Sequence, residues 1–358
     1  MNMTVDRRKV VLGGLATTAL ASVPFSAGAQ ELRTVRSGIG FKSVSPAVIN
    51  LFTGEALGFA RENGIRVESA VLGSANNCMI AIDRGAVEFA VVSSSFALPL
   101  HAKGQLPPVV MFYEYTYPYK WDIVVKPGSP IKSYQDLRGK KIGVSTLGTS
   151  DYPVTRMVMD SIGLNPDKDV SWVAVGEGIT AGVALERGVI DGLAYFDSGF
   201  AVIENAGIKL DYLPRPPKVP MIGGLFLGAR RDFIQKNPKL CIAYGRTVAM
   251  TSEFLLANPS AGAHAFGKMF PTSIPRNVSP AEAVRQTVVA IQRRISLYRP
   301  PYPGVKMGTI VESELREEAK FNELDIRDFS PLYTNELIDE INNFDRDRVT
   351  TMAKSYQF

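Results

Sequence analysis

The chain has 358 residues, of which 46% are hydrophobic and 21% are charged, and its formal net charge is +5. This balance is that of an ordinary folded protein and excludes an intrinsically disordered chain. Its basic residues are scattered, with no stripe of basic and aromatic side chains, so no nucleic-acid partner is expected. Because one hydrophobic core rarely fills a chain of this length, two domains are expected.

The first residues have the pattern of a bacterial export signal. Arg7, Arg8 and Lys9 precede an apolar run over 10–25, and small residues at 27–29 fit a cleavage point before Gln30. We therefore expect residues 1–29 to be a signal peptide, whose removal lowers the net charge to +3. The paired arginines suit the twin-arginine route, but Asp6 departs from that consensus, so the export route stays open. No later segment has the roughly 18 apolar residues that cross a bilayer, so the exported chain is expected to be soluble.

The first expected lobe begins with a strand over 32–39 and a helix over 45–64, in which Pro46 stands at the first turn. Residues 67–96 then form a module of strand, glycine turn, helix, glycine stop and second strand. A further strand over 109–113 follows. The aromatic segment 113–121 and the strand at 123–125 are expected to cross to another lobe.

The second expected lobe contains a strand over 142–145, a turn over 146–151 and a helix over 152–162. Residues 170–199 then repeat the module of 67–96 without a gap, at an offset of 103. Ala-Ile-Asp-Arg-Gly at 81–85 in the first copy corresponds to Ala-Leu-Glu-Arg-Gly at 184–188 in the second. A duplicated unit predicts two similar lobes that face each other across a cleft.

A proline-rich segment over 214–220 is expected to return the chain to the first lobe through a strand over 223–229. Helices opened by Pro238, Pro259 and Pro280 would complete that lobe. The fold class predicted is α/β, with a sheet flanked by helices in each lobe. The expected bounds are 30–122 and 228–358 for lobe one and 123–227 for lobe two.

The candidate ligand-binding residues follow the predicted strands, because open α/β sheets bind ligands outside the carboxyl ends of their strands. They are Gly40, Lys42, Ser43, Ser74, Asn76, Ser93 and Ser94 in the first lobe, and Thr149, Ser150, Asp151, Phe196, Asp197 and Ser198 in the second. Small hydroxyl groups dominate both sets. They predict neutral hydrogen-bond donors on both sides of the cleft.

Three of these candidates, the turn over 147–151, Asp197 and Lys42, have two interpretations each. The turn over 147–151 either binds an anion at a helix N-terminus or caps that helix through its own side chains. The hydroxyls of Thr149 and Ser150 are expected to face the cleft. Asp197 either binds a ligand amine or starts a turn, and Lys42 either supplies positive charge or is an ordinary exposed lysine.

Aromatic residues alternate at 113, 115, 117, 119 and 121 and would share one face of an extended segment. Tyr117 and Trp121 in this hinge either stack on a flat ligand or pack in the core. Cys78 and Cys241 are either a disulfide or two buried thiols. No metal-ligand spacing and no catalytic motif is present in the sequence, so no metal, cofactor or enzymatic activity is expected.

Several segments together resemble periplasmic substrate-binding proteins of ABC importers, in the nitrate, sulfonate, taurine and thiamine-precursor branch. They are the export signal, the Gly38–Gly40 loop, residues 81–90, residues 131–144 and residues 184–192. The resemblance implies a type II periplasmic binding fold that closes on one small molecule. It also implies a soluble periplasmic monomer that docks on an inner-membrane permease.

The pocket loops contain no obvious arginine, which argues against a strongly anionic ligand such as nitrate. The tyrosine-rich hinge favours an organic carboxylate or sulfonate with an aromatic body. The alternatives are an enzyme of the related branch that makes the thiamine pyrimidine, and a periplasmic sensor. The enzyme branch carries a cysteine cluster and an active-site histidine, which this chain lacks.

Overall fold

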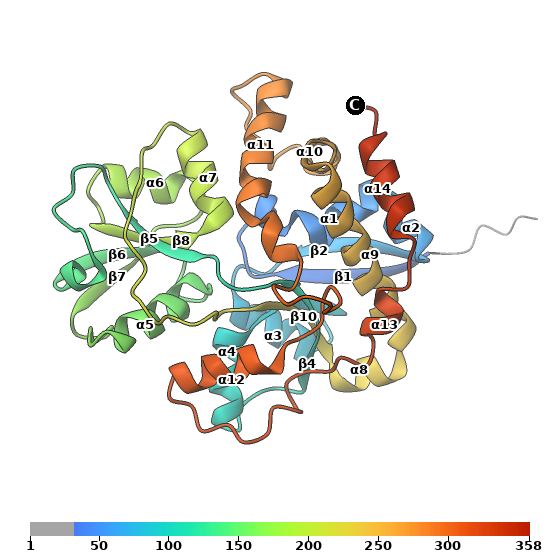
Figure 1. Cartoon of the computed structure of the whole chain (residues 1–358), viewed down its shortest axis with the longest axis horizontal. Coiled ribbons are helices and arrows are strands. Elements are labelled where there is room, and N and C mark those ends of the chain that lie inside the picture. The colour runs from blue at the N-terminus through green and yellow to red at the C-terminus, as the bar shows by residue number, and fades with distance from the viewer. Residues whose placement is uncertain (1–31) are drawn as a thin grey trace, which may run out of the picture. The chain divides into compact units, whose positions relative to one another are not determined.

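A computed structural model describes residues 32–358, so the predicted signal peptide lies outside the described residues (Figure 1). Within this range the strands form two five-stranded sheets. The first sheet has the order β2-β1-β3-β10-β4 and contains β1 (Arg33–Ile39), β2 (Ile65–Val71), β3 (Phe89–Ser93), β4 (Val109–Thr116) and β10 (Leu225–Arg230). The second has the order β7-β6-β8-β5-β9 and contains β5 (Trp121–Val125), β6 (Lys140–Val144), β7 (Val170–Ala174), β8 (Gly192–Phe196) and β9 (Asp211–Tyr212). We call each sheet with its helices a lobe.

The two sheets have the same topology. In each, the first three strands in the order are parallel, and the fourth runs antiparallel to both of its neighbours. That antiparallel strand is β10 in the first sheet and β5 in the second. Each is therefore reached by a crossing of the chain from the other lobe. The predicted fold class, two mixed sheets flanked by helices, is confirmed.

The sequence repeat corresponds to a structural repeat. Helices α3 (Ala75–Asp83) and α6 (Ile179–Glu186) each join an outer parallel strand to β3 or β8. The helices that follow, α4 (Ser94–Ala102) and α7 (Asp197–Asn205), begin at equivalent positions. Gly38 in β1 and Gly143 in β6 both allow a neighbouring side chain to pack closely on the sheet. An added Cβ would lie 2.4 Å from the side chain of Leu72 at Gly38 and of Ile190 at Gly143.

The helix expected over 45–64 is broken. It consists of the 3-10 turn η1 (Pro46–Val48), α1 (Ile49–Ala56) and α2 (Phe59–Glu62), separated at Gly58, whose φ of 82° is left-handed. The crossing is also shorter than expected, since β4 continues to Thr116 and β5 begins at Trp121. Only residues 117–120 connect the two sheets at this point.

The remaining helices surround the sheets. They are η2 (Tyr134–Leu137) and α5 (Asp151–Ser161) in the second lobe, followed by α8 (Arg231–Lys236), α9 (Pro238–Ala257), α10 (Pro259–Met269), α11 (Pro280–Arg294), η3 (Ile295–Tyr298), α12 (Glu312–Phe321), α13 (Ile338–Ile341) and α14 (Arg346–Lys354). The three prolines expected to open helices stand at the first positions of α9, α10 and α11. Helix α11 packs against α7 of the second lobe. No described helix is long and apolar enough to cross a membrane.

Candidate functional site

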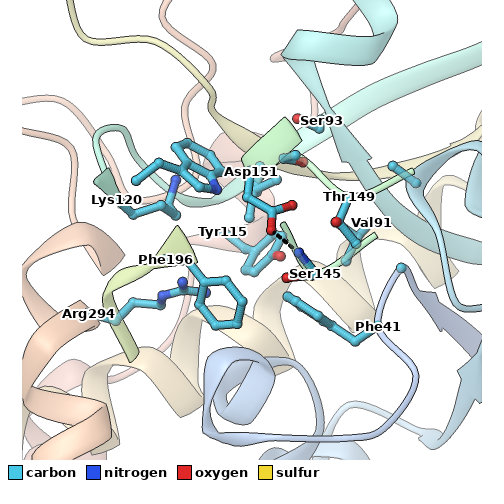
Figure 2. Close-up of a pocket in the computed structure, with 15 residues that line it drawn as sticks. Phe41, Val91, Ser93, Tyr115, Lys120, Ser145, Thr149, Asp151, Phe196 and Arg294 are labelled. Atoms are coloured by element: carbon cyan, nitrogen blue, oxygen red, sulfur yellow. Dashed lines mark hydrogen bonds between the residues drawn. The ribbon is translucent and has the colours of Figure 1, made fainter. Parts of the chain in front are cut away.

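A cavity lies between the lobes, at the carboxyl ends of the parallel strands (Figure 2). Its empty space, counted together with its opening to solvent, is about 520 Å³. The lining residues come from both lobes: Gly40, Phe41, Ala75, Val91, Ser93, Tyr115, Leu225 and Arg294 from the first, Trp121, Ser145, Thr149, Ser150, Asp151 and Phe196 from the second, and Lys120 from the crossing. The site is therefore complete only when the two lobes are together.

The duplication explains why these positions meet. Gly40 and Ser145 follow the central strands β1 and β6, while Ser93 and Phe196 end β3 and β8. The two residues of each pair therefore occupy equivalent places in the two sheets. An added Cβ at Gly40 would lie 3.0 Å from the amide nitrogen of Ala75, so glycine lets the loop approach the start of α3.

Three contacts hold the lobes together around the cavity. The Ala75 amide of the first lobe donates to the Gly148 carbonyl of the second at 2.9 Å, and the Lys42 amide donates to Oε1 of Glu177 at 3.0 Å. The third is an ion pair between Arg294 and Asp197. These contacts describe a closed arrangement of the two lobes.

Arg294, like Lys120 and Phe41, lines the cavity but was missed by the sequence reasoning, which considered only the pocket loops for an arginine, whereas Arg294 ends helix α11. Its side chain is 1% exposed at the end of α11. The guanidinium donates to Asp197 from Nε at 3.0 Å and from Nη2, and to the Ala47 carbonyl from Nη1 at 2.8 Å. Nothing near Arg294 in the sequence indicates this, because its partner lies 97 residues away on the other lobe.

Lys120 supplies a second buried cation. Its Nζ donates to the Gly223 carbonyl at 3.2 Å and lies 4.5 Å from the centre of the Trp121 ring. Burial lowers the pKa of Lys120 to about 7, and the nearby Arg294 acts in the same direction. An anion in the cavity would offset that cost and favour the charged form of Lys120.

The turn before α5 is organised by its own side chains. Asp151 accepts hydrogen bonds from the Ser145 amide at 2.7 Å and the Tyr152 amide at 3.2 Å, and burial raises the pKa of this carboxyl. The Thr149 hydroxyl donates to the Thr146 carbonyl at 2.8 Å and accepts from the Thr146 amide. The N-cap residue of α5 is Ser150, whose side chain makes no capping hydrogen bond, so the expected side-chain cap is not formed. The Asp151 carboxylate accepts from the Tyr152 amide at the start of the helix and would compete with an anion there.

Aromatic rings form the walls of the cavity. Phe41 of the first lobe and Phe196 of the second meet across it, with ring centroids 5.5 Å apart. Tyr115 and Trp121 also line it, whereas Tyr117 is buried elsewhere and its hydroxyl donates to the Thr309 carbonyl. The alternating aromatic residues do not share one face, because 113–116 and 121 belong to different sheets.

The other predicted residues lie near the cavity without lining it. Ser74 caps α3, and Asp197 is held by Arg294. Ser94 donates to Oε2 of Glu318, and the side chains of Lys42 and Asn76 are exposed. Ser43 and Ser198 line a second, neighbouring cavity.

Two polar atoms that face the cavity have no hydrogen-bond partner in the described part of the chain: the Tyr115 hydroxyl and Oγ of Ser145. Buried hydroxyls are normally satisfied, so these two are available to a ligand. Neither cysteine lines the cavity. Cys78 and Cys241 are free and buried, so a disulfide between them is excluded. Within residues 32–358 no group of His, Cys, Asp and Glu is arranged to hold a metal.

The fold and site define a two-lobed protein with a cavity between its lobes, the architecture that the sequence resemblance implied. A family model described as NMT1/THI5 like matches residues 45–262, and the chain belongs to this family. No curated protein sequence matches the chain.

Solved structures with a similar fold include the following three. A protein of Bordetella bronchiseptica RB50 is 22% identical with a TM-score of 0.65, and the match covers 87% of this chain and 98% of that one. The alkanesulfonate-binding protein SsuA of Xanthomonas axonopodis pv. citri, solved bound to MOPS, is 16% identical with a TM-score of 0.60, covering 87% and 98%. The periplasmic aliphatic sulphonate binding protein SsuA of Escherichia coli is 16% identical with a TM-score of 0.59, covering 81% and 91%.

Proposed function

We propose that this protein is the periplasmic solute-binding component of an ABC-type importer. It binds a small organic anion, a sulfonate or carboxylate with a flat apolar body, and presents it to a membrane permease. The observation that carries the proposal is the interlobe cavity, in which the buried cations Lys120 and Arg294 lie beside four aromatic rings.

The charges around the cavity favour a ligand with one acidic group. Asp197 already neutralises Arg294, and Asp151 is engaged with amide groups of its own turn. Among the described residues, Nζ of Lys120 has only the Gly223 carbonyl oxygen as a hydrogen-bond partner. The acidic group of the ligand therefore belongs beside Lys120, in the cavity that Tyr115 also lines.

The aromatic walls favour an apolar body behind that acidic group. Flat rings gain both from burial and from stacking or edge contacts with Phe41, Trp121 and Phe196. A bare inorganic ion such as nitrate would leave these rings without a partner. The similarity to sulfonate-binding proteins supports the same class of ligand.

Binding without chemical conversion is part of the proposal. Neither a cysteine nor a histidine lines the cavity among the described residues, and burial raises the pKa of the Cys78 and Cys241 thiols to about 12. A thiol with such a pKa is a poor nucleophile. This argues against the thiamine-precursor enzyme as the function of this site.

A thermal-shift screen tests the proposal. The purified protein is screened against alkane- and arenesulfonates, taurine, aliphatic and aromatic carboxylates, nitrate and thiamine pyrimidines. A ligand present at 100 times its dissociation constant adds about 2.7 kcal/mol to stability. We expect a clear rise in Tm with organic sulfonates or carboxylates, and recovery of the ligand unchanged by mass spectrometry. A rise with none of these anions, or conversion of the ligand, contradicts the proposal.

A further inference from the structure

We propose that Phe196 sets the length of ligand that the site accepts. Its ring is a partition between the anion cavity and a second, larger cavity that takes the far end of an elongated ligand. The inference rests on the proposed function, because it assigns the second cavity to the same organic anion.

The second cavity also has Phe196 in its lining. Its empty space, counted with its opening to solvent, is about 1280 Å³. Residues 43–47 before α1, the start of α7, and residues 270–273 after α10 surround it. Its lining mixes apolar side chains, such as Phe270 and Val202, with serine and threonine hydroxyls.

One of those hydroxyls lacks a partner. Ser198 is 1% exposed, lines this cavity, and its Oγ makes no hydrogen bond in the described part of the chain. A buried hydroxyl without a partner costs free energy unless a ligand or water satisfies it. The second cavity is thus suited to an apolar chain or ring that carries a hydrogen-bonding group near its end.

Within residues 32–358, Phe196 is the one residue that lines both cavities. Its ring contacts Phe41 across the cleft and lies 5.6 Å from the guanidinium carbon of Arg294. Gly199 makes room for two neighbouring rings, because a Cβ at this position would lie 2.3 Å from Cε1 of Tyr195 and 2.8 Å from Cε2 of Phe196. The partition is therefore a single side chain held in place by its neighbours.

A ligand that fits behind Phe196 is confined to the smaller cavity. Removing the ring connects the two spaces and lets a longer chain extend from the acidic group into the second cavity. Phe41 is the matched control, since it is the same residue type and contacts the same ring but lines only the first cavity.

The test uses n-alkanesulfonates and n-alkanoates of increasing length, together with their phenyl-terminated forms, titrated calorimetrically into the wild-type protein, Phe196→Ala and Phe41→Ala. Each extra methylene group that the apolar pocket accommodates or excludes changes affinity by about tenfold. We expect Phe196→Ala to raise the ratio of long-chain to short-chain affinity by about tenfold or more. Phe41→Ala should weaken binding of all lengths without changing that ratio. Phe196→Leu, which keeps an apolar side chain at the end of β8, should shift the ratio in the same direction by less.

The outcomes separate the two proposals. An unchanged ratio in the folded Phe196 variants, or an equal shift in Phe41→Ala, overturns the role of Phe196 while leaving the solute-binding function intact. If the wild-type protein binds no member of either series but binds another organic anion of the thermal-shift screen, the length inference alone fails. If it binds none of these anions, the proposed function fails as well.

Discussion

The guanidinium of Arg294 and the carboxylate of Asp197 form an ion pair that joins the ends of two helices from opposite lobes. The side chains are 1% and 13% exposed, respectively, and the pair lies beside the ligand cavity. Ion pairs shielded from solvent are sensitive to the loss of one partner, because the remaining charge is left without compensation. This contact therefore contributes to the closed arrangement of the lobes.

Asp197→Asn should destabilise the protein by about 3 kcal/mol, since it leaves the Arg294 guanidinium buried without a countercharge. The pair between Arg293 and Glu204 is the control, because it joins the same two helices at 2.6 Å but is more exposed. Glu204→Gln should cost less than about 1 kcal/mol. Urea unfolding of the two variants measures the difference. Equal losses of unfolding free energy would show that the buried ion pair does not stabilise the protein more than the exposed one.

Binding of an organic anion should weaken as the pH rises above about 7, the pKa to which burial lowers Lys120. The neutral amine no longer attracts the acidic group of the ligand. Lys120→Met should reduce affinity by about tenfold or more and remove most of this pH dependence. Lys42→Met, which removes an exposed lysine outside the cavity, should leave both unchanged. Calorimetric titrations between pH 6 and 9 distinguish the variants.

The contribution of Lys120 to the stability of the unliganded protein should rise with pH, opposite to its effect on ligand binding. The folded-state pKa is about 7 and the ordinary value is 10.5, so the unfolded chain binds more protons at Lys120 between these pH values. The contribution of Lys120 to stability therefore rises with pH across this window. Because Glu314, Glu114, Asp197 and Arg294 also act on Lys120, the measured quantity is the difference in unfolding free energy between the wild type and Lys120→Met. A difference independent of pH would contradict the assignment.

Tyr115→Phe should weaken ligand binding by about fivefold without lowering stability, because its buried hydroxyl has no hydrogen-bond partner among residues 32–358. Tyr244→Phe is the matched variant, since the Tyr244 hydroxyl donates to Oγ of Ser37 at 2.7 Å. Its loss should cost about 1 kcal/mol of stability and leave affinity unchanged. Thermal unfolding and calorimetry of both variants test the contrast. A loss of stability without a loss of affinity in Tyr115→Phe would show that the ligand does not use this hydroxyl.

Gly148→Ala should hinder closure of the lobes, because a Cβ at this position would lie 2.8 Å from Cβ of Ser74 on the opposite lobe. We expect weaker ligand affinity with little change in the unfolding free energy. Adding Ser74→Gly removes the opposing Cβ at a cost of a few tenths of a kcal/mol to the helix cap, and should restore affinity. Absence of rescue in the double variant would mean that the steric contact is not the cause.

The thiols of Cys78 and Cys241 should not react with a thiol reagent in the native protein. Both are buried, and their pKa values are raised to about 12. Labelling should occur only in denaturant, and it should then detect two thiols per chain. Rapid labelling of the native protein would reopen the enzymatic alternative.

Local patterns predicted much of the fold because they reflect contacts within a short segment. The repeated module, the glycine stops and the prolines that open α9, α10 and α11 all act within a turn or two of the chain. The candidate site was predicted only in part. Gly40, Ser93 and Phe196 could be found because they end strands, whereas Arg294 depends on how a distant helix packs against α7.

The alternating aromatic residues show why periodicity fails at a crossing. A period of two predicts one shared face only while the strand continues in one sheet. Here residues 117–120 pass between two sheets, which sends Tyr117 into the core and Trp121 into the cavity. The prediction for the turn before α5 failed for a different reason. The sequence alone does not tell whether the Asp151 carboxylate accepts hydrogen bonds from its own backbone or from a ligand.

A crystal structure of the protein with its tightest-binding organic anion tests the central claim most directly. We predict that the ligand lies in the interlobe cavity against Phe41 and Phe196, with its acidic group within hydrogen-bond distance of Nζ of Lys120 and the Tyr115 hydroxyl. A ligand bound outside the interlobe cavity, or inside it with the acidic group away from Lys120, would contradict this account.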